Sequence, residues 1–237
     1  MTDEAKNLLM RLKKEKKVQK QIELINALKD YNQEEMVNHV LLVHLQRKDH
    51  DSLRLEILSA LNYNFEGIVQ PLINILSDPS EPIAIKEKAI NLLGQSRNKK
   101  ALKAIIKAYK KSKEPAILDN LVQALTYFQD KNAIKILIKA LKKEELQLAI
   151  LTGLARNNAT VYSSKDLIKE LLKFEKTDHF ESIHFDKILD NLLFKFEISS
   201  IEELRRAFNE NKLDVKIALF TKELKSNKSL LEKVDAK

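Results

Sequence analysis

Cysteine is absent from the 237-residue sequence, and so is tryptophan. The lack of cysteine excludes disulfide bridges, thiol catalysis and the zinc or iron–sulfur sites that need cysteine ligands. Glycine and proline are also scarce, with three and four residues. Because a β-rich fold of this length needs many tight turns, which glycine and proline usually supply, the composition favours an all-helical chain.

Long apolar runs are lacking as well. The most apolar stretch, residues 40–45, is interrupted by His44, and the charged N-terminal residues contain no apolar run of the kind found in signal peptides. We therefore expect a soluble, cytoplasmic protein without a transmembrane segment.

Internal repetition is the strongest pattern in the sequence. Residues 99–111 recur 32 positions later as 131–143, with lysine on lysine at five positions. A second element, such as LINAL at 24–28 and ILSAL at 57–61, occurs five times at spacings of 33, 32, 32 and 29 residues. Both elements have apolar residues three and four positions apart, which is typical of amphipathic helices. Four leucines of the second element are predicted to be core residues: Leu61, Leu93, Leu125 and Leu154.

Alternating helices of two kinds predict an all-α fold. A single pair cannot bury its apolar face, so neighbouring pairs must stack, and we predict an α-solenoid, a right-handed superhelix of about six antiparallel helix pairs. The chain is expected to form one solenoid over 1–237. Residues 1–33 would be N-terminal capping helices, either a pair or one long helix, 34–157 the regular repeats, and 158–237 irregular helical repeats.

The run 78–94 resembles the second-helix signature of HEAT repeats, in particular the short type named after phycobilisome lyases. The signature positions are occupied in order by Ile85, Lys86, Ala89, Ile90, Leu93 and Gly94. In the preceding repeat the basic position is Arg54, but Leu118 and Gln147 occupy it in later repeats. The resemblance covers about 34–157 and implies a HEAT-like fold whose concave surface holds a protein partner.

Positive charge is concentrated in one part of the chain. Residues 97–143 carry a net charge of +10, whereas the whole chain carries +8. On two helices, lysines three or four positions apart fall on the side opposite the apolar stripe. We call these residues the lysine ladder: Lys99, Lys103, Lys107, Lys110, Lys131, Lys135, Lys139 and Lys142. If the two helices stack side by side, they form one lysine patch. It is either a solvated helix face or a binding surface for nucleic acid, acidic protein segments or anionic membranes.

Catalytic motifs are not found: the sequence has no glycine-rich phosphate loop, nucleophile elbow or paired-histidine zinc motif. The cluster of Asp178, His179, Glu181, His184 and Asp186 has ligand types that suit a metal, but such residues are ordinary at a polar helix start. We predict no catalytic, cofactor or metal site and no cofactor. The resemblance keeps a lyase-type or other HEAT-fold enzyme as a third reading.

The leading hypothesis is a non-enzymatic protein–protein interaction scaffold of unidentified partner. The second helix of each pair would line the concave surface, with these exposed candidates for partner binding: Arg54, Lys86, Lys88, Asn91, Asp119 and Gln123. The alternative is nucleic-acid or other polyanion binding through the lysine ladder. Partner binding should fall steeply with salt under the second hypothesis and much less under the first.

Overall fold

The computed structural model describes residues 1–48, 50–174 and 183–234. These residues form α-helices and short 3-10 turns and contain no strand. The helices in order are α1 (Asp3–Lys14), α2 (Val18–Leu28), α3 (Glu35–Leu45), α4 (Asp51–Ala60), α5 (Val69–Ser77), α6 (Ile83–Gln95), α7 (Lys99–Lys111), α8 (Pro115–Leu125), α9 (Lys131–Ala140), α10 (Glu144–Arg156), α11 (Asn158–Tyr162), α12 (Lys165–Phe174), α13 (Ile183–Phe196), α14 (Ile201–Asn209) and α15 (Leu213–Val234). Two 3-10 turns, η1 (Lys29–Tyr31) and η2 (Glu66–Ile68), lie in the connections. The all-α expectation is confirmed.

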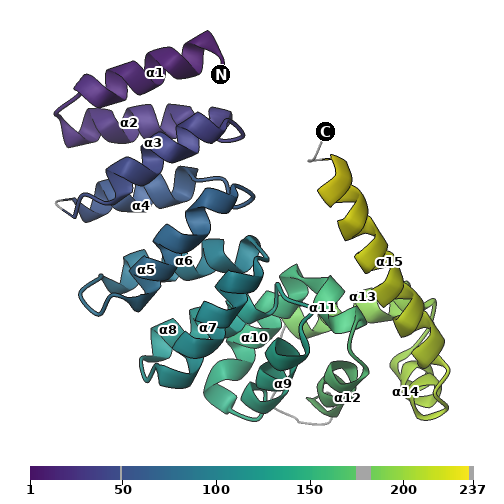
Figure 1. The fold of residues 1–237 in the computed structure, drawn as a ribbon. Helices are drawn as coiled ribbons and strands as arrows, with labels where there is room; N and C mark the ends of the chain where they lie inside the picture. Colours follow the sequence, from purple (N-terminus) through teal and green to yellow (C-terminus); the bar gives the residue numbers. More distant parts are fainter. Residues whose placement is uncertain (49, 175–182, 235–237) are drawn as a thin grey trace. The chain divides into compact units, whose positions relative to one another are not determined.

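The chain divides into two compact units, Met1–Ala124 and Leu125–Lys237. In the first unit, α2, α4 and α6 pack on one another in order and form one layer. On the other side, α3 packs on α1, and α7 packs on α5 (Figure 1). Across the two layers, α1 packs on α2, α3 on α4 and α5 on α6, so these helices form a stack of pairs, as an α-solenoid requires.

The second unit is less regular. Here α10 packs on α9 and α13, α9 packs on α12, and the short helix α11 lies against α10, α12, α13 and α15 (Figure 1). The sequence pattern predicts helices over 166–174, 183–196, 201–208 and 215–224. The first three agree with α12 to α14 within one residue, whereas α15 continues beyond the fourth to Val234. The pattern misses α11, whose five residues are too few to show a helical period.

The repeated leucines lie in the core, as predicted. Leu61 is 4% exposed, and Leu93, Leu125 and Leu154 are fully buried. The recurring element of the sequence is the C-terminal part of the even-numbered helices from α2 to α10, and in the first unit this pattern builds the layer of α2, α4 and α6. No described helix is long and apolar enough to span a membrane.

The N-terminal segment is a helix pair, which decides between the two arrangements left open by the sequence. α1 ends before Glu15, whose carboxylate Oε1 accepts hydrogen bonds from the backbone N–H groups of Lys16 (2.9 Å) and Lys17 (2.8 Å). The Gln21 side chain also donates to the Glu15 carbonyl at 2.8 Å. The carboxylate thus stabilises a turn without glycine or proline.

Candidate functional site

Helix α7 presents its lysines on the face opposite the core. Its N-terminus is capped by Asn98, whose side-chain oxygen accepts from the backbone N–H of Lys100 at 2.8 Å. The helix buries Ala101, Leu102 and Ile105, so the periodicity places the lysines on the opposite, solvent-facing side. Six exposed lysines result: Lys99, Lys100, Lys103, Lys107, Lys110 and Lys111.

These six lysines form no ion pair with any residue that the structure describes. Other lysines of the same unit do: Lys48 Nζ lies 2.6 Å from Asp78 Oδ2 and 3.1 Å from Glu81 Oε1, and Lys29 Nζ lies 3.1 Å from Glu56 Oε2. The positive charge of α7 is therefore not compensated by ion pairs within the described part of the unit.

A groove of about 830 Å³ runs beside α7. We call it the lysine groove. Its lining comes from the C-terminal end of α5, the first turns of α6 and α8, and the outer face of α7: Ile73, Leu76, Ser77, Pro79, Ile83, Lys86, Lys100, Lys103, Ala104, Lys107, Ala108, Lys111, Ser112, Glu114 and Ile117. Glu114 is the single acid among these lining residues. The groove therefore combines an apolar floor with a cationic rim.

Only some residues of the predicted lysine ladder line this groove. Lys103 and Lys107 line it, whereas Lys99 and Lys110 lie outside its lining. In the second unit, Asp130 caps α9 by accepting from the backbone N–H groups of Asn132 (2.7 Å) and Ala133 (3.2 Å). The ladder residues of that unit, Lys131, Lys135, Lys139 and Lys142, are all exposed. A joint patch of α7 and α9 stays a prediction.

A second groove, of about 360 Å³, lies over the C-terminal halves of α4 and α6 and is rich in side-chain amides. We call it the amide groove. It is lined by Asn32, Gln33, Leu58, Ser59, Leu61, Asn62, Tyr63, Asn64, Lys88, Asn91, Leu92 and Gln95. These residues come from three successive repeats, because the amides recur about 30 positions apart in the turn after α2, the turn after α4 and the end of α6.

Hydrogen bonds hold several of these amides in place. Asn62 Nδ2 donates to Gln33 Oε1 at 3.1 Å, and the backbone N–H of Asn64 donates to Asn62 Oδ1 at 2.9 Å. On α6, Gln95 Nε2 donates to Asn91 Oδ1 at 2.8 Å. Within the described residues, no hydrogen bond occupies Asn91 Nδ2, Gln95 Oε1 or the Asn64 side chain, so donors and acceptors are left for a ligand.

The residues predicted for partner binding are divided among different places. Lys88 and Asn91 are exposed and line the amide groove, whereas Lys86 lines the lysine groove. Lys86 and Lys88 are two positions apart on α6 and so point about 200° apart around the helix. Asp119 and Gln123 on α8 are half-buried, and burial raises the pKa of the Asp119 carboxyl.

Arg54 is not exposed, which corrects the expectation from the sequence. It is 2% exposed, and its Nε donates to the carbonyl of Leu45 at 3.2 Å while NH2 donates to Glu81 Oε1 at 2.9 Å. Burial opposes ionisation of Glu81, but the hydrogen bonds from Arg54 and Lys48 outweigh it and lower the pKa of that carboxyl. Arg54 therefore connects α4 to the turn between α5 and α6, and its side chain is not accessible to a partner.

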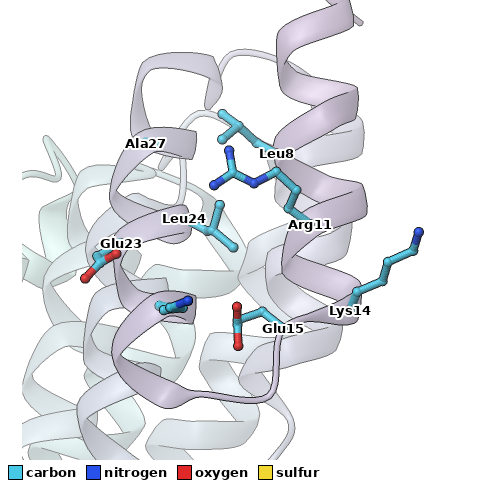
Figure 2. Close-up of a pocket in the computed structure, with 8 residues that line it drawn as sticks. Leu8, Arg11, Lys14, Glu15, Glu23, Leu24 and Ala27 are labelled. Carbon is cyan, nitrogen blue, oxygen red and sulfur yellow. The ribbon is translucent and has the colours of Figure 1, made fainter.

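A third groove, of about 570 Å³, lies between α1 and α2. Figure 2 shows the Arg11 side chain extending toward α2, with Leu8 and Leu24 between the helices, whereas Lys14 extends away from α2. Its charged lining residues are Arg11, Lys14, Glu15, Lys20 and Glu23. Because basic and acidic residues line this groove in similar number, the groove favours neither anionic nor cationic ligands.

The histidine and acid cluster considered in the sequence falls partly outside the described residues, since 175–182 are not described and this range contains Asp178, His179 and Glu181. In the described ranges, no group of three or more histidine and acid side chains is placed to hold a metal ion. His184 and Asp186 lie on the first turn of α13.

The packing of the helices defines a helical-repeat protein, an α-solenoid of stacked helix pairs. Residues 69–155, which span α5 to α10, match the family model of HEAT repeats. The match supports the HEAT-repeat resemblance, while the narrower phycobilisome-lyase type stays a prediction. No curated protein matches the sequence. HEAT repeats commonly serve as protein-interaction scaffolds, because stacked helix pairs present extended surfaces.

Proposed function

We propose that this protein is a non-enzymatic protein-interaction scaffold and that the amide groove binds an extended segment of the partner. The observation that carries the proposal is the recurrence of side-chain amides along three successive repeats of the first unit. Each amide offers donors and an acceptor, as each peptide group does, so a row of amides matches the main chain of a bound segment.

The geometry of the groove suits a main-chain ligand. Tyr63 is 44% exposed at the groove, where an aromatic ring can cover a bound side chain at low entropic cost. Asn62 is 8% exposed and is hydrogen-bonded to Gln33 in the turn after α2 and to Asn64 in its own turn, which fixes the floor before a partner arrives. Such preorganisation reduces the entropy lost on binding.

The test begins with selection of binders from a displayed library of random peptides, using the purified full chain as target. Calorimetry then compares the best peptide on the native protein and on Asn64→Ala/Asn91→Ala. Removing two amides is expected to weaken binding about tenfold, since each buried polar group of the peptide would lose its partner. Asn7→Ala/Asn26→Ala, which changes exposed asparagines of α1 and α2 outside the groove, is the matched control and should bind as the native protein does.

Two results would overturn the proposal. One is a selection that yields no peptide above background. The other is a set of peptides whose affinity is unchanged by Asn64→Ala/Asn91→Ala, or reduced equally by the control pair.

A further inference from the structure

We propose that the lysine groove is a second docking site, one that takes an acidic amphipathic helix of a partner protein. This goes beyond the proposed function, because it names another surface and the chemistry of its partner. The two grooves share no lining residue, and α6 contributes to both, through Ile83 and Lys86 on one side and Lys88 and Asn91 on the other.

The charge of the groove requires an acidic partner. Lys100, Lys103, Lys107 and Lys111 provide about one ammonium per helical turn over roughly 17 Å, at 1.5 Å per residue. None of the four forms an ion pair within the described residues, so no internal carboxylate must be displaced when a partner binds. Lys86, whose Nζ makes a long 3.4 Å hydrogen bond to the Pro79 carbonyl, adds a fifth charge from the opposite wall.

The floor of the groove requires that the partner also be apolar on one side. Ile83 is 47% exposed in the first turn of α6, and Ile73 and Leu76 of α5 are partly exposed beside it. Burying this apolar surface against an apolar partner is favourable, whereas a phosphate backbone has no apolar surface to place against it. No aromatic side chain lines the groove, so it offers no ring for base stacking. An acidic protein segment therefore fits better than nucleic acid.

The spacing of the lysines favours a helix as the bound form. An α-helix lying along α7 has the same 5.4 Å pitch, so an acid on each turn of the partner meets a lysine on each turn of α7. Its apolar residues at positions three and four apart would then lie over the floor formed by α5, the start of α6 and Ile117. An extended strand places alternate side chains nearly 7 Å apart and falls out of register within a few residues.

The experiment uses a fluorescent synthetic peptide of glutamate, leucine and alanine, about 18 residues long, with leucines on one helical face and glutamates flanking them. Anisotropy measures its binding to the full chain. We expect saturable binding that weakens severalfold as salt rises from about 50 to 200 mM. A peptide of the same composition, with leucines scattered around the helix, should bind at least about tenfold more weakly, because it cannot bury them together.

Matched variants locate the site. Lys103→Gln/Lys107→Gln should weaken binding about fivefold, whereas Lys99→Gln/Lys110→Gln, with the same charge change on the same helix but outside the groove, should leave it near the native value. Ile83→Ser should weaken binding about tenfold. Val43→Ser, at a residue 62% exposed and outside the groove, is its control.

Several results would overturn this inference. Equal binding of the scattered peptide, or equal losses in the two lysine pairs, would mean that net charge alone binds the probe. Tighter binding of a DNA duplex or of phosphatidylserine vesicles than of the helical peptide, abolished by Lys103→Gln/Lys107→Gln, would replace the acidic helix by a nucleic acid or a membrane. Asn64→Ala/Asn91→Ala should not affect this probe, so failure of one groove is distinguishable from failure of the other.

Discussion

The guanidinium of Arg54 lies 2.8 Å from Glu81 Oε2, and both side chains are only 3% exposed. The pair connects α4 to the turn before α6, and Lys48 extends it to the surface, 3.1 Å from Glu81 and 2.6 Å from Asp78. A buried ion pair of this kind costs desolvation energy, so breaking it on one side is more harmful than replacing both partners.

Arg54→Met should therefore destabilise the protein by about 3 kcal/mol, because it leaves the Glu81 carboxylate buried without its guanidinium. Arg54→Met/Glu81→Leu should be less destabilised than Arg54→Met alone. Urea denaturation of the native protein, both single variants and the double variant gives the coupling free energy. Additive losses would show that the two side chains contribute independently.

The same network should make stability depend on acid pH. Hydrogen bonds from Lys48 and Ser80 lower the pKa of Asp78, and those from Arg54 and Lys48 outweigh burial and lower the pKa of Glu81. Since both folded-state values lie below the ordinary values of 3.8 and 4.5, the stabilisation is complete above those values and is lost as pH falls below them.

Thermal unfolding should be measured from pH 7 to pH 3. These two carboxyls should change the midpoint little above about pH 5 and should lower it as the pH falls further. Glu81→Gln should start lower and decline less steeply. Glu35→Gln, at an exposed carboxyl of α3 with no ion pair in the described part of the chain, should follow the native curve. Parallel curves for the native protein and Glu81→Gln would contradict the assignment.

Periodicity was sufficient to predict the helices of the regular repeats and the buried leucines, because a repeated layer needs the same apolar positions in each copy. It failed to predict that Arg54 is buried, because the Glu81 carboxylate that pairs with Arg54 is 27 residues away and belongs to the next repeat. It also missed the amide groove, because Asn32, Asn62 and Asn64 lie in turns, which helical periods do not describe. Their recurrence about every 30 residues is the signal that would have revealed them.

The turn between α6 and α7 contains Arg97 in the left-handed region, with φ of 49°. A residue with a Cβ atom is strained there by roughly 1 kcal/mol, and glycine is not. Arg97→Gly should therefore stabilise the protein by about 0.5–1 kcal/mol in urea denaturation, whereas Arg97→Ala should give no gain. A loss of stability in Arg97→Gly would mean that the arginine side chain contributes more than its backbone costs.

Leu93 tests the repeat alignment itself. It is fully buried in α6, the helix that packs on both α4 and α5, and Leu93→Ala should cost about 2–5 kcal/mol because the cavity cannot close without moving a neighbouring repeat. Hydrogen exchange should then quicken in α4 and α5 as well as in α6, since a stack of pairs is stabilised by its neighbours. Met10→Ala, at a residue 60% exposed on α1, is the control and should change the thermal midpoint little. An unchanged midpoint in Leu93→Ala would mean that the repeat element does not face the core, and the layer of even-numbered helices would lose its basis.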